Sequence, residues 1–466
     1  MNREQLECLK IGIDFGTCFS YPAYLHAGVV KVLKNTTVRH LDGVPSVFYY
    51  GTNYEEREYL CGHLAAEYAI GSGFSESSVV RYIKQQLRGK NNFWLNKRVL
   101  GDFTADIRWD DFLLQGKEFT PSYIVACLIE NCIELAKSQI GKNAVTVSEA
   151  VIAIPAYFSR MERDVLLDAA NHAGINKVRF IYEPIAAAID YCETMNDVSD
   201  PVLVYDLGGG TIDVACLRKQ DKKTYEVFAI DGARIGGIDW DKSLAKLIVA
   251  RLGDKKLKCP PAEAINILTL DPYGYKESVS TARLKHKLSD TERSSVRVRF
   301  DDVSEILNKE SITRFEGFDI GRKEFEDATQ YLLDGTLDVV RSVIAQCGIN
   351  ERKNMHLVLT GGGSYMPQIE PAVCKVLYDY GINIINKKPA YSPHLPGAFD
   401  AIRDISNRVI PFCPETAIAS GAARYASGNY ELFASASFQK ELKFAPNTSI
   451  YDMLLFRNHS PQNVQS

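Results

Sequence analysis

The sequence lacks any long apolar run. No stretch of its 466 residues approaches the roughly 18 consecutive apolar residues that suggest a membrane span. The N-terminal segment MNREQLECLK also lacks the apolar core and the small-residue cleavage site of a secretory signal. From these two absences we expect a cytoplasmic protein that has no membrane partner.

Disulfide frameworks, zinc sites and strong net charge are absent as well. The eleven cysteines are scattered, odd in number and without a CxxC pair, a pattern typical of reduced, mostly buried thiols. The formal net charge is −4, with 54 Lys and Arg against 58 Asp and Glu. This balance gives no electrostatic reason to expect nucleic acid as a partner.

What the chain does have is enough apolar sequence for more than one core. With 466 residues, 46% of them hydrophobic, it exceeds the usual single domain, so two lobes are expected. Helices are predicted to open near Pro121, Ser159 and Pro184, where capping residues or proline mark a first turn. Short apolar strands are predicted between them, at 10–15, 150–154, 178–181, 202–205 and 356–360. This alternation predicts an α/β architecture.

One strand-and-turn pattern occurs twice. A strand ends in Asp14-Phe15-Gly16-Thr17, and a later strand ends in Asp206-Leu207-Gly208-Gly209-Gly210-Thr211. One such turn is weak evidence, because most Asp-x-Gly turns merely join strands. Two copies far apart in the sequence indicate two similar lobes that face a shared ligand.

The residue types in these turns suit a polyphosphate. Glycine lets backbone N–H groups approach phosphate oxygens, because no side chain obstructs them. Carboxylates at the strand ends, Asp14 and Asp206, can hold Mg²⁺ through its water shell. We therefore predict one nucleotide–magnesium site between the two glycine turns.

Four stretches carry a more specific signal. They are residues 11–20 (IGIDFGTCFS), 151–191 (VIAIPAYFSRMERDVLLDAANHAGINKVRFIYEPIAAAIDY), 202–216 (VLVYDLGGGTIDVAC) and 357–367 (LVLTGGGSYMP). In order and spacing they resemble the nucleotide-binding (ATPase) domain of the seventy-kilodalton heat-shock chaperone family, and the resemblance covers roughly residues 8–428. It implies the actin-like two-lobed ATPase fold of the actin, sugar kinase and heat-shock ATPase superfamily. In that fold two ribonuclease-H-like domains each carry a smaller subdomain.

The resemblance also implies a domain layout. The first lobe is expected at 1–195 with an upper subdomain at about 39–115, and the second at 196–428 with an upper subdomain at about 230–310. A segment at about 386–408, rich in proline and turn formers, is interpreted as a surface insertion. Residues 429–466 are expected to form a C-terminal extension. It is too short for the β-rich peptide-binding domain that family chaperones carry after the ATPase domain.

Site residues follow from the matching positions. The resemblance implies magnesium ligation by Asp14, Asp206 and Glu183, directly or through water. It implies catalytic roles for Lys84, Glu183, Asp206, Thr211 and Asp213, with Lys84 reaching the γ-phosphate and Glu183 placing the attacking water. Nucleotide contacts are implied for Asp14, Gly16, Thr17, Cys18, Gly208, Gly209, Gly210, Gly237, Lys285, His286, Ser289, Gly361, Gly362, Gly363 and Tyr365.

At the nucleoside end the sequence departs from the family pattern. A glutamate, a lysine and an arginine on one helix, and a second arginine in the glycine loop, correspond here to Ala282, Lys285, His286 and Tyr365. The ribose-binding carboxylate is thus missing, and the preference for ATP over GTP is left open. We predict that the rings of His286 and Tyr365 stack on the two faces of the base. The alternative is that both are ordinary surface residues.

Cys18, Pro155 and Arg163 also lie at positions that matter in the family pattern. Cys18 replaces the usual hydroxyl residue, so its phosphate contact is expected to use the backbone, and no catalytic role is predicted for the thiol. Pro155 and Arg163 match positions that relay nucleotide state between lobes in the family. Their simpler interpretation is a strand end and a surface helix residue.

The function that this resemblance implies is a slow Mg²⁺-dependent ATP hydrolase and chaperone-like switch. Its lobes would open and close with ATP or ADP and bind a protein client or co-chaperone, and we expect a monomer. Three alternatives remain: a small-metabolite kinase of the same superfamily, a nucleotide-dependent actin-like scaffold, and a degenerate nucleotide binder that does not hydrolyse ATP.

Overall fold

The computed structural model describes most of the chain in separate ranges. They are residues 7–34, 43–51, 59–71, 78–87, 112–140, 145–195, 198–270, 280–290, 293–308, 310, 316–348, 354–385 and 413–442. Within them no helix is both long and apolar enough to span a bilayer. The predicted insertion at about 386–408 lies outside the described residues. We call residues 7–195 the first lobe and residues 198–442 the second lobe.

A six-stranded sheet forms the base of the first lobe. Its central strand β1 (Glu7–Phe15) runs parallel to β10 (Val145–Ile154) and antiparallel to β2 (Phe19–His26). The outer strands are β11 (Val178–Tyr182), β3 (Val29–Val32) and β4 (Val44–Pro45). The last five residues of β1 are all buried without alternation, because helices cover both faces of the sheet.

The second lobe contains a sheet of the same design. Strand β12 (Val202–Leu207) runs parallel to β17 (Asn354–Thr360) and antiparallel to β13 (Ile212–Lys219). The outer strands are β14 (Thr224–Ala233), β18 (Asn383–Ile384) and β19 (Glu431–Ala434). The strand order β11-β10-β1-β2-β3 of the first sheet matches β18-β17-β12-β13-β14 of the second. The duplication predicted from the repeated Asp-Gly turn is therefore present in the topology, and the α/β class is confirmed.

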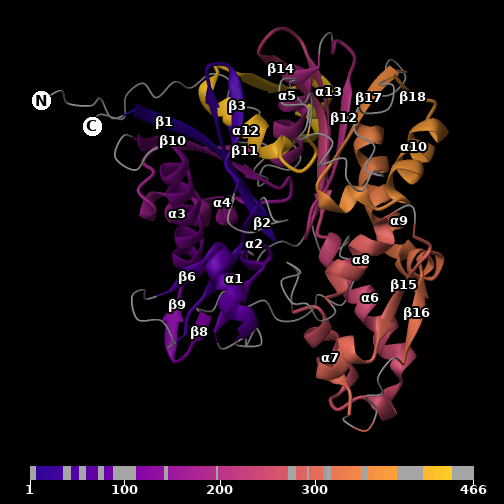
Figure 1. The fold of residues 1–466 in the computed structure, drawn as a ribbon. Helices are drawn as coiled ribbons and strands as arrows, with labels where there is room; N and C mark the ends of the chain where they lie inside the picture. Colours follow the sequence, from indigo (N-terminus) through magenta and orange to yellow (C-terminus); the bar gives the residue numbers. More distant parts are fainter. Residues whose placement is uncertain are drawn as a thin grey trace, which may run out of the picture.

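Two helices pack together where the lobes meet: α5 (Glu183–Thr194) and α12 (Ala417–Ser427) (Figure 1). Helix α5 contacts β12 and β13 of the second sheet, whereas α12 packs on β1, β2 and β10 of the first. Each lobe thus supplies a helix to the other's sheet, although α12 falls within the range predicted for the second lobe. A side chain on Gly421 would collide with the backbone of Ala186, so this close approach requires glycine.

Longer helices cover the outer faces of the two sheets. In the first lobe these are α3 (Pro121–Ile140) and α4 (Arg160–His172), and in the second α9 (Arg322–Gln346) and α10 (Ile369–Asp379). Helix α4 begins at the predicted position after Ser159 with a capping box, in which the Ser159 N–H donates to Glu162 Oε2 at 2.7 Å.

A smaller subdomain extends from each lobe, toward the lower ends in Figure 1. The first contains β5 (Val47–Tyr49), β6 (Leu60–Cys61), α1 (Gly62–Gly71), β7 (Val79–Arg81), α2 (Ile83–Gln86), β8 (Phe112–Leu114) and β9 (Lys117–Phe119). The second contains α6 (Gly237–Leu252), η2 (Asp254–Lys256), α7 (Pro261–Leu268), α8 (Thr281–Ser289), β15 (Ser295–Arg299), η3 (Asp301–Ile306) and β16 (Gly317–Gly321). Two short elements complete the second lobe, η6 (Gly362–Tyr365) after β17 and α13 (Ala436–Leu442) after β19.

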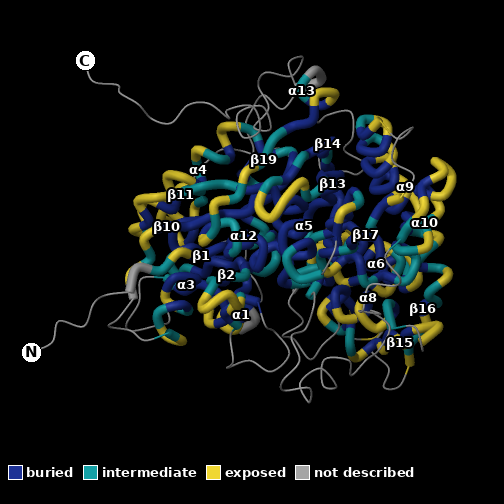
Figure 2. The backbone as a smooth tube through the Cα atoms, turned by 90° about the horizontal axis from the view of Figure 1, so that it is seen from above, coloured by how far each residue is buried: buried dark blue, intermediate teal, exposed yellow. Residues whose placement is uncertain are grey.

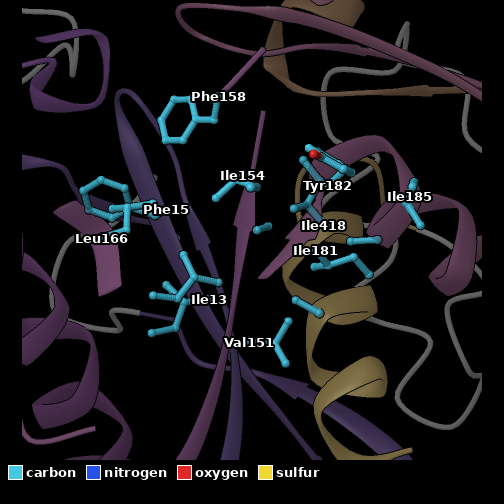
Figure 3. Close-up of a cluster of buried hydrophobic side chains, with 14 of the residues drawn as sticks. Ile13, Phe15, Val151, Ile154, Phe158, Leu166, Ile181, Tyr182, Ile185 and Ile418 are labelled. Atoms are coloured by element: carbon cyan, nitrogen blue, oxygen red, sulfur yellow. The ribbon is translucent and has the colours of Figure 1, made fainter. Parts of the chain in front are cut away.

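The apolar core follows the two sheets, whose strands form the dark interior of Figure 2. In Figure 3, Phe15 lies beside Leu166 of α4, while Ile418 of α12 lies beside Ile181 on the other side of β10. Each fully buried aliphatic side chain contributes about 1.5–3 kcal/mol. This packing fixes the ends of β1 and β12, from which the candidate site is built.

Candidate functional site

Acidic residues end the equivalent strands of the two lobes. Asp14 lies near the end of β1, and Asp206 lies near the end of β12. Asp206 stands directly opposite Asp213 in the antiparallel β12–β13 pair and next to Thr360 of β17. Two carboxylates in directly opposed positions destabilise a sheet that has no other compensation. Their placement therefore points to a function other than folding.

A third carboxylate joins this pair from the helix between the lobes. Glu183 begins α5 and is followed by Pro184, which suits the first turn of a helix. Ligand atoms of Glu183, Asp206 and Asp213 all lie within 4.8 Å of one another, and all three residues are buried. The grouping contains two of the three predicted metal ligands, with Asp213 in place of Asp14.

Burial and mutual repulsion disfavour negative charge on these groups. Burial, aided by the charge of Glu183, raises the pKa of Asp14 to about 7. The same two causes hold the pKa values of Asp206 and Asp213 well above their usual range. Asp14 also raises the pKa of Asp206, so it acts on the same cluster although it stands at its margin.

Two oxygens of the cluster have unmet bonding capacity. Among the described residues, Asp206 Oδ1 and Asp213 Oδ2 are buried and accept no hydrogen bond. Buried carboxylate oxygens without donors are rare, because desolvation is then uncompensated. A hard divalent cation with oxygen ligands would satisfy both, and it would also neutralise the repulsion that raises the pKa values. The residues present thus fit Mg²⁺.

One cation already enters the cluster from the first subdomain. Lys84 of α2 is buried and its Nζ forms an ion pair with Glu183 Oε1. Burial by itself lowers the pKa of Lys84, but the carboxylates of Glu183, Asp14 and Asp213 outweigh it, so the net pKa is raised. The ammonium group therefore stays charged and points at the predicted catalytic carboxylate.

The two glycine turns face each other. A Cβ built on Gly209 would lie 2.7 Å from Cys18 Sγ, and one built on Gly210 would lie 2.9 Å from Thr17 Oγ1. Side chains at either glycine would therefore close the approach between the turns. The structure brings together the two segments that the sequence predicts to hold one polyphosphate.

The second turn is supported by the helix that follows it in space. The N–H of Gly237 donates to Gly208 O at 3.0 Å, and the N–H of Ile238 donates to Gly209 O at 2.8 Å. These bonds use carbonyl oxygens of the turn and leave its N–H side for a ligand, except that Gly208 N–H donates to Thr211 O at 2.9 Å. Gly237 therefore shapes the turn through its backbone.

The third glycine run contacts the carboxylate cluster as well. Gly361 has a φ of 78°, and a Cβ there would lie 2.6 Å from Asp206 Oδ1 and would also collide with Leu207 O. Gly363 is similarly confined by Leu207, whereas Gly362 is exposed and has open space around its Cβ position. Only the first and third glycines of this run are required by their surroundings.

Lys285 and Cys18 lie beside the phosphate-side turns. Lys285 Nζ donates to Gly237 O and to Asp241 Oδ2, each at 2.9 Å, so its charge is compensated within the second lobe. The Ser289 hydroxyl donates to Lys285 O at 3.0 Å, along the helix. Burial raises the pKa of the Cys18 thiol to about 12, which agrees with the absence of a predicted catalytic role.

His286 and Tyr365 occupy different elements. His286 lies on an exposed face of α8, and Tyr365 is half-buried at the end of η6. Ala282 on α8 is buried, so no side chain there replaces the missing ribose carboxylate. The stacking of both rings on one base stays a prediction.

The predicted relay positions connect differently to the cluster. Pro155 directly follows β10, and the next residue, Ala156, donates its N–H to Asp213 Oδ1 at 2.6 Å. This bond couples the end of β10 in the first lobe to a carboxylate of the second. Arg163 lies on α4, and its relay role stays a prediction.

Sequence reasoning missed residues that hold the site from outside. Gln85 donates from Nε2 to Gly210 O at 3.2 Å, and Arg234 donates to Gln85 O at 3.2 Å. Glu162 caps α4 through one carboxylate oxygen, and its other oxygen faces Arg234. Gln85 adjoins Lys84 in the sequence, which was the one available signal. No local pattern marks Arg234.

The chain matches a model of a known protein family. A family model described as Hsp70 protein matches residues 10–387. The matched range includes the carboxylate cluster, Lys84 and all three glycine runs, and it ends before α12.

Proposed function

Because this chain belongs to the Hsp70 family, we propose that it is a slow, Mg²⁺-dependent ATP hydrolase whose lobes move with nucleotide state to bind a partner protein. Family membership carries an ATP-binding, chaperone-type ATPase function and an actin-like ATPase fold. The metal requirement, the low rate, the lobe movement and the individual residue roles are the finer steps of the proposal.

The observation that carries the proposal is the meeting of two equivalent glycine turns beside a buried carboxylate cluster. Gly209 and Cys18 approach each other from different lobes, and Glu183, Asp206 and Asp213 converge next to them. Backbone N–H groups on one side and carboxylates with unmet oxygens on the other are what a phosphate–cation pair requires.

Asp206, Asp213 and Glu183 would hold the ion, with Asp14 acting through its water shell. When bound, Mg²⁺ would neutralise charge that develops on the transferring phosphoryl group. The protein's own task is then positioning. Asp213 is fixed by the Ala156 N–H at 2.6 Å, and Glu183 is fixed by Lys84. These bonds orient the carboxylates toward an attacking water.

Thr211 and Lys84 complete the arrangement. The Thr211 hydroxyl bonds to the Asp213 carboxylate, and its carbonyl closes the glycine turn through Gly208 N–H. The charged ammonium of Lys84 lies where a γ-phosphate entering between the turns would need compensation. This division of roles needs no strong base, in keeping with phosphoryl transfer.

Partner binding and location belong to the same proposal. The two glycine turns belong to different lobes, so closing on a ligand changes the angle between the lobes. A partner protein that binds one of the two arrangements more tightly would then respond to the nucleotide state. All cysteines whose side chains the structure describes are free thiols, which supports the cytoplasm as the compartment.

Single-turnover and steady-state ATP hydrolysis test the proposal, using wild type, Glu183→Gln, Asp206→Asn and the control Asp327→Asn. Asp327 lies on α9 in an exposed pair with Lys323. We expect both site variants to lose about a hundredfold or more in kcat and the control to lose nothing. Wild-type protein without Mg²⁺-dependent nucleotide binding would refute the proposal. A large rise in turnover with a small hydroxylated acceptor would instead indicate a kinase.

A further inference from the structure

A buried arginine outside the predicted site joins the two lobes beside it. Arg234 lies between β14 and α6 in the second lobe, and its side chain is 5% exposed. A buried guanidinium group must find partners for its charge and its N–H groups. The partners that the structure shows for Arg234 lie in the first lobe.

Three different kinds of contact hold this guanidinium. Nη2 lies 3.4 Å from Glu162 Oε1, and Nη1 donates to Gln85 O at 3.2 Å. The guanidinium carbon lies 4.8 Å from the ring centroid of Tyr157, within the range of a cation–π contact. Arg234 thus contacts α2, α4 and the segment that precedes α4.

Glu162 divides its two oxygens between the lobes. Oε2 accepts the Ser159 N–H and caps α4 within the first lobe, whereas Oε1 faces Arg234 of the second. Glu162 is fully buried, so its charge requires compensation, to which Arg234 contributes. On its own this pair would suggest a purely structural role for the arginine.

The contact with Gln85 points further, because Gln85 follows Lys84 on α2. Helix α2 has four residues, and the residue before it, Tyr82, adopts the left-handed conformation with φ 56°. Such a short helix is not stable by itself, so its position depends on outside contacts. Gln85 supplies two of them to the second lobe: its carbonyl accepts from Arg234, and its amide donates to Gly210 O.

We propose that Arg234 is a positioning residue that ties α2 to the second phosphate turn and so holds the Lys84 ammonium at Glu183. The effect of Arg234 on catalysis rests on the proposed ATPase function. The contacts that connect Arg234, Gln85 and Gly210 are present in the nucleotide-free protein. Because Arg234 belongs to the second lobe and holds α2 of the first, a movement of the lobes toward each other would also place Lys84.

The test separates positioning from neutralisation of Glu162. Arg234→Met removes the polar contacts with Glu162 and Gln85 and the cation–π contact with Tyr157. Arg234→Met combined with Glu162→Gln also removes the carboxylate charge left behind. Arg234→Lys keeps a charge for Glu162 but cannot reach Gln85 with a second nitrogen. Arg251→Met is the matched control, because Arg251 lies on α6 in a partly exposed pair with Glu324.

Hydrogen–deuterium exchange of residues 79–87 without nucleotide is the first measurement, and kcat and KM for MgATP are the second. We expect faster exchange in all three Arg234 variants and a loss of about tenfold to a hundredfold in kcat, with KM changed less than about threefold. The double variant should recover thermal stability without recovering exchange protection or kcat. Arg251→Met should match wild type throughout.

Two results would overturn the proposal. Unchanged exchange of residues 79–87 in the Arg234 variants would show that α2 is held without the arginine. Recovery of kcat and exchange protection in the double variant would show that Arg234 serves only to neutralise Glu162. A wild-type protein that turns over no ATP, but whose variants show the exchange response, would contradict the ATPase function and still support the tie.

Discussion

The phosphate side and the nucleoside side of the candidate site are built in different ways. On the phosphate side Asp206, Asp213 and Glu183 are buried, lie within 4.8 Å of one another and come from strand and helix ends fixed by two sheets. On the nucleoside side His286 and Tyr365 lie on a helix face and a short 3-10 turn, exposed or half-buried. The phosphate side is thus preorganised by the fold, whereas the nucleoside side depends on its ligand.

This difference indicates where binding energy resides. A preorganised cluster with like charges loses stability in the free protein and regains it when a cation and phosphates bind. The ring of His286 is exposed and that of Tyr365 is half-buried, so a bound base adds to them only the stacking energy. We therefore expect affinity to come mainly from the polyphosphate and magnesium, with modest selectivity for the base.

The largest expected effect comes from Gly361, which connects the two sides. Gly361→Ala places a side chain at φ 78° and 2.6 Å from Asp206 Oδ1, so the loop must move or the carboxylate must turn. We expect a loss of about 3 kcal/mol in the free energy of unfolding and about a hundredfold in kcat. Chemical denaturation and ATP turnover measure the two effects.

Gly362→Ala is the matched control for this substitution. Gly362 is the next residue in the same run, is exposed, and has no heavy atom within 4 Å of its Cβ position. Because this space is open, we expect the free energy of unfolding of Gly362→Ala to equal that of the wild type. Equal effects of the two substitutions would show that the run acts through general loop flexibility, and the contrast between the two sides would lose its structural basis.

A pH effect is expected next, from Asp14. Burial and Glu183 raise the pKa of Asp14 from 3.8 to about 7, so between these pH values the folded state holds a proton that the unfolded state has lost. Its stabilising contribution is complete below pH 4 and is lost as pH rises through 7. Without magnesium and nucleotide, the free energy of unfolding should fall by up to about 1.4 kcal/mol per pH unit in this window from Asp14 alone.

Asp14→Asn should make this slope shallower, because the amide does not titrate. Denaturation curves at pH 5, 6, 7 and 8 measure the slope, with Asp338→Asn as the control, since Asp338 is an exposed carboxylate on α9. Saturating MgATP should flatten the wild-type slope, because bound cation favours the charged carboxylates. If the free energy of unfolding depends on pH equally in Asp14→Asn and wild type, the pKa of Asp14 is not raised in the folded protein, and the prediction is wrong.

The sequence predicted the phosphate side more completely than the nucleoside side, because the phosphate side is built on the ends of regular strands. A strand that ends in Asp-x-Gly determines local backbone, and its repetition at Asp206 predicted both the duplicated sheets and the approach of the two turns. Contacts such as that of Arg234 with Gln85 join positions 149 residues apart and follow no local pattern. The packing of α12 on the first sheet likewise depends on tertiary contacts with Gly12 that sequence spacing does not encode.

The smallest expected effect is at Tyr365, on the nucleoside side of the site. If the ring stacks on the base, Tyr365→Ala should weaken nucleotide binding by about fivefold to tenfold, the lower part of the range for aromatic–base stacking. Isothermal titration with MgADP measures the change, and kcat should stay near the wild-type value because Tyr365 does not touch the carboxylate cluster in the proposed arrangement.

Two controls decide what a weaker affinity at Tyr365 means. Tyr378→Ala removes a ring that is 80% exposed on α10 and should leave binding unchanged. Inorganic triphosphate with Mg²⁺ has no base, so its affinity should be equal in wild type and Tyr365→Ala. A weaker affinity for triphosphate as well would show that Tyr365 acts through the glycine run of η6 and not on the base. An unchanged affinity for MgADP would show that Tyr365 does not belong to the site. Either result would confine nucleotide recognition to the preorganised phosphate side.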